Sequence, residues 1–210
     1  DGGVDYQHED LAANMWTNED EIPGNGIDDD NNGYIDDFYG WNFVMGVPTI
    51  VPHEHGTHVA GTIAAVNNNG IGVAGVAGGS GNGDGVRIMS CQVFSAVPGG
   101  TDEYAGGFEE AFIYAADNGA TISNNSWGGG APSQVMLDAI NYYIDNAGID
   151  ENGNSTGPVQ GGGLPIFAAG NFNSYSDYIG LPRAAYPSQY DLGISVANTN
   201  HYDMKSTSSH

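Results

Sequence analysis

The chain has very little positive charge. Its 210 residues include 3 Lys and Arg against 26 Asp and Glu, which gives a formal net charge of −23 at pH 7. Proteins that bind nucleic acids neutralise phosphates with clustered Lys and Arg side chains. We therefore expect no nucleic-acid partner.

Cysteine and long apolar segments are also scarce. The single cysteine, Cys91, cannot form a disulfide within the chain, and its place in the strand-like run VRIMSCQVF predicts a packed thiol. No apolar run approaches the roughly 18 residues of a membrane span, so we expect no span in this segment. The first residues, DGGVDYQHED, have no signal-peptide pattern, so any export signal is expected outside these residues.

The remaining composition is that of one globular domain. With 40% apolar and 10% aromatic residues the chain can bury a core, and 34 glycines predict many tight turns. Residues 1–37 hold 12 of the 26 acidic residues and show no long periodic apolar pattern. We expect this stretch to consist mainly of loops.

From residue 86 onward, short β-rich runs alternate with segments of helical period. The predicted strands are 86–94, 120–124, 164–169 and 194–197, and the predicted helices begin at Thr101 or Asp102 and at Pro132. This order favours an α/β fold with a doubly wound, mostly parallel sheet and helices on both faces. Ligands of such sheets bind beyond the carboxyl ends of the strands, which points to the residues after Asn124 and Ala169.

Residues 53–58, HEHGTH, are the densest group of titratable side chains and run into VAGTIAA, a predicted helix. Two chemistries fit them. The spacing H-x-H-x-x-H resembles that of metallo-β-lactamase-type zinc hydrolases, although Thr57 stands where those have an aspartate. Alternatively, His55 is a general base, which requires a carboxylate to orient it and a nucleophile to serve.

The string HGTHVAGT closely resembles the histidine motif of the subtilisin-like serine proteases. Three further segments resemble that family's other signatures in the same order, over residues 1 to about 200. The first is DGGVD, which resembles the aspartate motif with Gly2 where Thr or Ser is usual. The resemblance implies that Asp1 orients His55 and stabilises its charged form. It also implies a buried strand ending at Asp1, so we expect the domain to be incomplete at this end.

Two segments resemble the parts of these proteases that bind the substrate and the developing charge. SNNSWGG resembles the strand edge that pairs with the substrate backbone, which implies substrate binding by Ser126, Trp127 and Gly128. FAAGN resembles the motif whose Asn donates a hydrogen bond to the oxyanion, which gives Asn171 a catalytic role by resemblance.

The nucleophile of the family is missing from the sequence. The family places it in Gly-Thr-Ser, which does not occur in these 210 residues, and Ser206, Ser208 and Ser209 lack that context. We therefore expect residues 1–210 to be a partial catalytic domain, incomplete at both ends and inactive by itself. Within it we expect an acidic insertion at about 18–40 and an α/β core at about 53–200.

The acidic insertion contains half of a calcium loop. Its candidate ligands are Asp28, Asp30, Asn32 and Asp36. Gly33 supplies the turn, but Tyr39 replaces the bidentate Glu of an EF-hand, and Asp37 could close the shell. Since calcium-stabilised loops are common in the resembling family, we expect one structural Ca²⁺ here. A second loop, residues 67–70, matches a place where family members bind calcium, and we leave it open.

The resemblance implies a secreted or cell-surface, calcium-stabilised serine endopeptidase that acts on protein or peptide substrates without an organic cofactor. Two other functions stay open at this point. One is a pseudoprotease or calcium-dependent binding module that never had a nucleophile. The other is a zinc hydrolase using His53, His55 and His58, although we expect His58 to be packed and His53 to be exposed.

Overall fold

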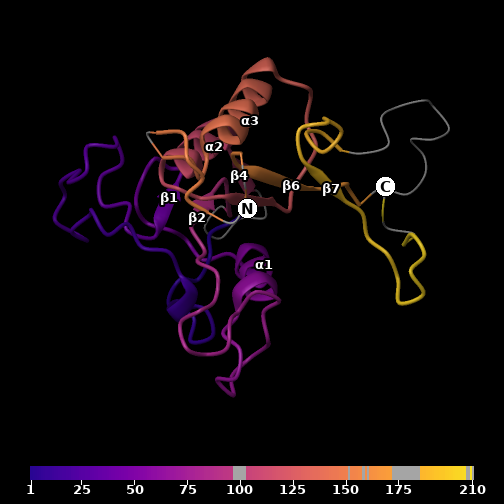
Figure 1. Ribbon diagram of the computed structural model, residues 1–210, viewed down its shortest axis with the longest axis horizontal. Helices are drawn as coiled ribbons and strands as arrows, with labels where there is room; N and C mark the ends of the chain where they lie inside the picture. Colours follow the sequence, from indigo (N-terminus) through magenta and orange to yellow (C-terminus); the bar gives the residue numbers. More distant parts are fainter. Residues whose placement is uncertain are drawn as a thin grey trace. The chain divides into compact units, whose positions relative to one another are not determined.

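The computed structural model divides the chain into two compact units, Asp1–Ala111 and Phe112–His210. Figure 1 shows the elements in chain order. None of the helices in the described part of the chain has the length and apolar content of a membrane span. The structure describes residues 1–96, 103–150, 152–157, 159, 161–171, 185–206 and 209.

The first unit contains short strands and one long helix. Its elements are η1 (Ala12–Asn14), β1 (Gly40–Asn42), α1 (Glu54–Ala64), β2 (Ser90–Gln92), β3 (Phe94–Ala96) and β4 (Glu103–Ala105). Strands β1 and β2 pair in parallel, with Trp41 opposite Cys91, and β3 and β4 pair antiparallel. Before β1 the described chain forms only the single 3₁₀ turn η1, so the prediction of loops in the acidic first part is confirmed.

The first three residues lie beside the segment that follows β2. The carbonyl of Asp1 accepts hydrogen bonds from the amides of Val93 (2.9 Å) and Phe94 (3.3 Å), and Gly2 forms a parallel bridge with Phe94. Just beyond, Val4 joins a buried cluster with Leu11, Met15 and Ala60 of α1. These contacts fix the start of the chain against the helix that carries His55.

Two sequence predictions around β3 and β4 are wrong. The strand predicted at 86–94 is instead two strands in different sheets, Ser90–Gln92 and Phe94–Ala96. The helix predicted from Thr101 or Asp102 begins only at Phe108, as α2 (Phe108–Asp117), because residues 103–105 pair with β3 and Gly107 takes a φ of 69°. Thr101 and Asp102 lie outside the described residues.

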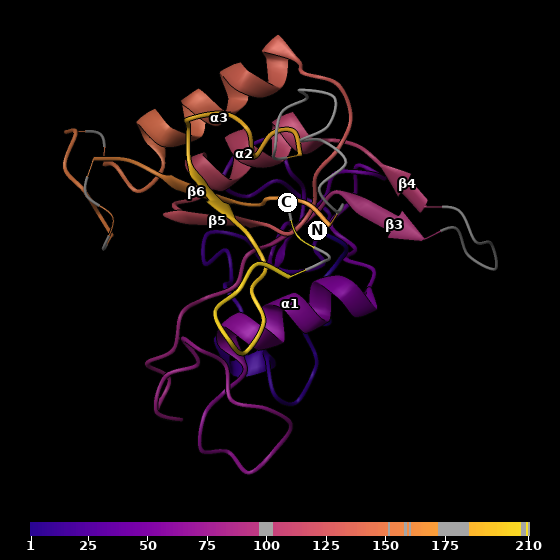
Figure 2. The same cartoon turned by 90° about the vertical axis from the view of Figure 1, so that its right-hand side faces the viewer.

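The second unit is built on a parallel sheet. Its strands β5 (Ile122–Asn125), β6 (Leu164–Ala168) and β7 (Ile194–Val196) lie in that order, and α3 (Gln134–Asn146) links the first two. Phe167 of β6 contacts Phe112 of α2, whose ring also meets Tyr143 of α3. The end of α2 and α3 therefore cover the same face of this sheet (Figure 2). The predicted α/β class, with parallel strands, is confirmed.

Candidate active site

His55 and Asp1 are joined by a side-chain hydrogen bond in the first unit. His55 is the second residue of α1, and its Nδ1 lies 2.8 Å from Oδ1 and 3.0 Å from Oδ2 of Asp1. The Asp1 carboxylate also accepts the amide N–H of Gly2 at 2.6 Å. Because an ionised carboxylate only accepts, Nδ1 of His55 carries the proton and Nε2 is left as an acceptor. This is the state of a general base, and the ring is accessible, with 56% of the side chain exposed against 16% for Asp1.

Three hydrogen bonds tie the start of α1 to the first residues of the chain. The ring Nδ1 of His53 accepts the amide N–H of His55 at 3.1 Å, and the amide of His53 donates to the carbonyl of Gly3 at 2.8 Å. The hydroxyl of Thr57 accepts the amide N–H of Asp5 at 3.0 Å. His53 is half-buried, so the prediction that it is simply exposed is wrong.

Glycine is required where these two segments meet. A Cβ added to Gly56 would lie 2.0 Å from the carbonyl oxygen of Gly2, and one added to Gly2 would lie 2.6 Å from Cβ of His53. Both distances are far below van der Waals contact. The backbone of the Asp1 segment therefore approaches the helix directly, which brings the Asp1 carboxylate within reach of His55.

The histidine cluster does not form a zinc site. Nδ1 of His53 caps the helix and Nδ1 of His55 faces Asp1. His58 is exposed, so the expectation of a packed side chain is wrong. Over the described residues, the one group of three or more His, Cys, Asp or Glu side chains that could share a metal ion lies elsewhere, in the acidic loop.

The segment Ser126, Trp127 and Gly128 follows β5 in the second unit without regular structure. The Asn124 side-chain amide donates to the Ser126 hydroxyl at 2.9 Å. The Trp127 ring meets Phe167 edge to face, with centroids 6.4 Å apart. Gly128 is exposed, and a Cβ on it would lie 3.1 Å from Cβ of Ala185.

Asn171 occupies the matching position after β6. It is exposed in a bend that follows Gly170, whose φ of 115° favours glycine. The preceding Ala169 donates its amide to Val196 and accepts the amide of Ala185, both within 2.9 Å. Because β5 and β6 are parallel neighbours, the segments after them lie at the same edge of the sheet. This is the edge where the sequence predicted ligand-binding residues.

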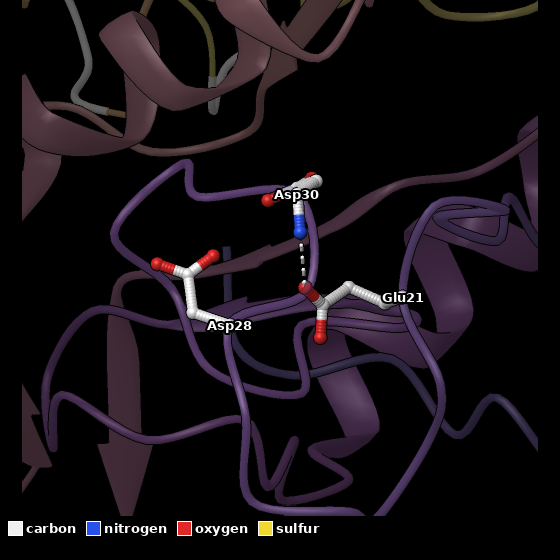
Figure 3. A group of neighbouring side chains, drawn as sticks. All are labelled: Glu21, Asp28 and Asp30. Carbon is white, nitrogen blue, oxygen red and sulfur yellow. Dashed lines mark hydrogen bonds between the residues drawn. The ribbon is translucent and has the colours of Figure 1, made fainter.

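Three carboxylates converge in the acidic loop: those of Glu21, Asp28 and Asp30, whose oxygens lie within 4.8 Å of one another (Figure 3). Glu21 is buried, with 4% of its surface exposed, and its Oε1 accepts the amides of Asp29 (2.8 Å) and Asp30 (3.3 Å). Clustered carboxylate oxygens are the donors that Ca²⁺ prefers, so the donor set fits this ion. The sequence analysis missed Glu21, since it lies outside the loop spacing and only its burial against the loop shows its part.

The other predicted ligands of this loop have different partners. The side-chain amide of Asn32 donates to Asp30 and Asp37, at 3.0 and 3.1 Å. The carboxylate of Asp36 accepts the amides of Asn25 and Gly26, both at 3.0 Å. Asp28 and Asp30 are thus the two predicted ligands that the structure brings together with Glu21.

The loop at residues 67–70 packs against Asp10. The buried carboxylate of Asp10 accepts the side-chain amide of Asn69 at 2.7 Å and the amide of Val73 at 2.9 Å. Among the described residues, Oδ1 of Asn67 is a buried oxygen without a hydrogen bond. The sequence analysis did not single out Asp10, which is remote from this loop in sequence.

Comparison with known proteins agrees with this geometry. A profile described as the subtilase family matches residues 1–210, so the chain belongs to the subtilase family. It is 54% identical over 79 residues to Subtilisin-like protease 1 of Plasmodium berghei (strain Anka), covering 36% of this chain and 13% of that protein. It is 34% identical over 152 residues to fervidolysin of Fervidobacterium pennivorans, covering 71% and 18%. Identity to thermitase of Thermoactinomyces vulgaris is 32% over 172 residues, covering 80% and 50%. The chain therefore spans half or less of each of these relatives, and the resemblance inferred from its motifs is confirmed.

Proposed function

We propose that the full-length protein is a serine endopeptidase that hydrolyses peptide bonds of protein or peptide substrates. The observation that carries this proposal is the hydrogen bond from Nδ1 of His55 to the carboxylate of Asp1 at the start of α1. It leaves Nε2 as the proton acceptor that a serine nucleophile needs. Family membership and the names of the relatives support the same reaction.

In the proposed mechanism the nucleophile is a serine outside residues 1–210, because these residues contain no Gly-Thr-Ser. This serine attacks the scissile carbonyl while His55 takes its proton and later gives it to the leaving amine. Asp1 holds His55 in the required tautomer. Asn171, together with a backbone amide, binds the oxyanion, and the segment Ser126 to Gly128 pairs with the substrate backbone.

We also propose that residues 1–210 form part of one doubly wound domain with an acidic insertion at about 18–40 and a core at about 53–200. Parallel pairing in both units supports it. In the second unit the described helices pack on the face of β6 that carries Phe167. Ile194 and Val196 of β7, which point to the other face, are 47% and 51% exposed. In a doubly wound domain further helices cover such a face.

The proposed cofactor is a structural Ca²⁺ held by Glu21, Asp28 and Asp30. When bound, the ion would neutralise three carboxylates that otherwise repel one another. The residues themselves order the loop: Glu21 binds its backbone amides, and the paired amides of Asn32 hold Asp30 and Asp37 together. We propose that the enzyme is secreted or on the cell surface, for which the charge of −23 and the calcium loop are the support.

The proposal is tested with a fluorophosphonate probe, which labels activated serines, together with hydrolysis of a denatured protein substrate. The full-length protein should be labelled and should cleave the substrate, and H55A should abolish both. The 210-residue polypeptide should show neither, since it lacks the nucleophile. A full-length protein that folds but is not labelled would instead be a pseudoprotease or binding module, and turnover by the 210-residue chain would refute the external serine.

A further inference from the structure

His53 caps helix α1 through its ring. It precedes Glu54, the first helical residue, with an extended backbone (φ −127°, ψ 138°), and its Nδ1 accepts the amide N–H of His55. Helix caps of this kind are usually Ser, Thr, Asp or Asn, whose side-chain oxygen takes the amide proton. In this chain an imidazole nitrogen does so, and the amide that it holds belongs to the proposed general base.

The same residue also contacts the segment that carries Asp1. Its amide donates to the carbonyl of Gly3 at 2.8 Å. A Cβ on Gly2 would lie 2.6 Å from Cβ and 2.7 Å from Cγ of His53, closer than real Cβ atoms come to another heavy atom. The His53 side chain therefore fills the space that a side chain at position 2 would need. This gives a physical reason for Gly2, which stands where the aspartate motif of the family usually has Thr or Ser.

We propose that His53 is a positioning residue for the Asp1–His55 pair, and that Gly2 and His53 are a coupled pair in which the large cap requires the small residue. The inference rests on the proposed endopeptidase function. His53 holds both partners at once: its ring fixes the His55 backbone, and its amide fixes the Asp1 segment. The 2.8 Å separation between Nδ1 of His55 and Oδ1 of Asp1 depends on both contacts.

The first test compares H53A with H53N in the full-length protein. H53A removes the cap and should lower kcat by about tenfold to a hundredfold with little change in KM, since misplacing a catalytic group by about 1 Å costs on the order of a hundredfold. H53N restores a side-chain acceptor at the cap and should recover most of the lost kcat. Equal losses in the two variants, or wild-type kcat in H53A, would overturn the positioning role.

The second test is a double-mutant cycle. G2S alone should lower kcat, because its side chain collides with His53. In G2S/H53N the smaller cap makes room, so kcat should exceed the product of the two single effects by about tenfold. Independent sites would give the simple product, and that result would reject the coupling.

A control and a second readout separate positioning from stability and from the proposed function. S133A removes the side-chain cap of α3, where the Ser133 hydroxyl accepts the amide of Met136, and should lower the melting temperature without the loss of kcat. Exchange of the His55 amide, followed by NMR, should be slow in the wild type and in H53N and fast in H53A. This exchange reports on the cap even if the wild-type protein cleaves nothing, in which case the proposed function fails and the cap is still tested. Unchanged exchange in H53A would refute the cap itself.

Discussion

The carboxylate of Asp1 accepts one hydrogen bond from Nδ1 of His55 at 2.8 Å and another from the amide of Gly2 at 2.6 Å. The second bond orients the carboxylate before the first is made. The acid partner of the proposed base is therefore held by its own backbone, and the tautomer of His55 follows from it. This relationship makes the contribution of Asp1 directly testable.

Replacing Asp1 by Asn in the full-length protein should lower kcat by about 10⁴-fold. An amide can donate to Nδ1 and so stabilise the tautomer with its proton on Nε2, where the base must accept. The measurement is steady-state hydrolysis of a peptide substrate, with KM expected to change little. D5N is the matched control, since Asp5 lies in the same segment but its carboxylate only accepts the amide of Gln7. A D1N enzyme as active as D5N would contradict the role of Asp1.

Replacing Asn171 by Ala should lower kcat of the full-length protein by about 10²- to 10³-fold at nearly constant KM. That range is the known value for such a donor in a subtilisin and is carried over to this relative. The reason is that the oxyanion forms only after attack, so its hydrogen bond acts on the transition state and leaves substrate binding unchanged. N146A, on the exposed side of α3, removes a similar side chain far along the chain from β6 and should leave kcat unchanged. A loss expressed only in KM would assign Asn171 to substrate binding instead.

Replacing Glu21 by Gln should remove most of the stabilisation by calcium. At a calcium concentration about 100 times the dissociation constant, one site adds about 2.7 kcal/mol to the free energy of unfolding. The measurement is the melting temperature in calcium minus that in EDTA, with isothermal titration calorimetry for affinity. The comparison of each variant with itself removes the effect of lost hydrogen bonds on the calcium-free state.

D36N separates the structure from the loop spacing in this experiment. The spacing predicts Asp36 as a ligand, whereas the structure turns its carboxylate to the amides of Asn25 and Gly26. We expect D36N to keep the calcium response that E21Q loses. The reverse result would show that the ligands are those of the sequence pattern, and no calcium response in the wild type would remove the site.

The sequence predicted those parts whose cause is local. Strands at 120–124, 164–169 and 194–197 and the helix before Gly148 were found within a few residues, because a periodic apolar face and a terminal glycine set each one. Residues 103–105 were predicted as helix because their pairing with β3 is a tertiary contact that the spacing of apolar residues does not show. The motifs brought Asp1 and His55 together correctly. The cap by His53 and the convergence of Glu21 with Asp28 depend on burial and on backbone approach, for which the sequence carries no pattern.

The thiol of Cys91 gives a prediction about pH. Although Cys91 keeps some exposed surface as a residue, desolvation of its thiol by burial in β2 raises the pKa to about 12. A free thiol ionises near 8.5, and only the thiolate is alkylated. At pH 9 the folded chain should therefore react with iodoacetamide on the order of 10³-fold more slowly than the chain in denaturant. Equal rates would show that the thiol is not desolvated in the folded state.

The same shift contributes to the pH dependence of stability. The unfolded thiol loses its proton above about pH 8.5, whereas the folded one keeps its proton until about pH 12. The contribution of Cys91 is thus fully present below pH 8.5, and the free energy of unfolding falls as the pH rises through this window. Urea denaturation at pH 7 and pH 10 should show a larger decrease for the wild type than for C91A, and the difference between the two isolates Cys91 from the tyrosines that ionise in the same range. An identical decrease in both proteins would show that the pKa of Cys91 is the same in the folded and unfolded chains.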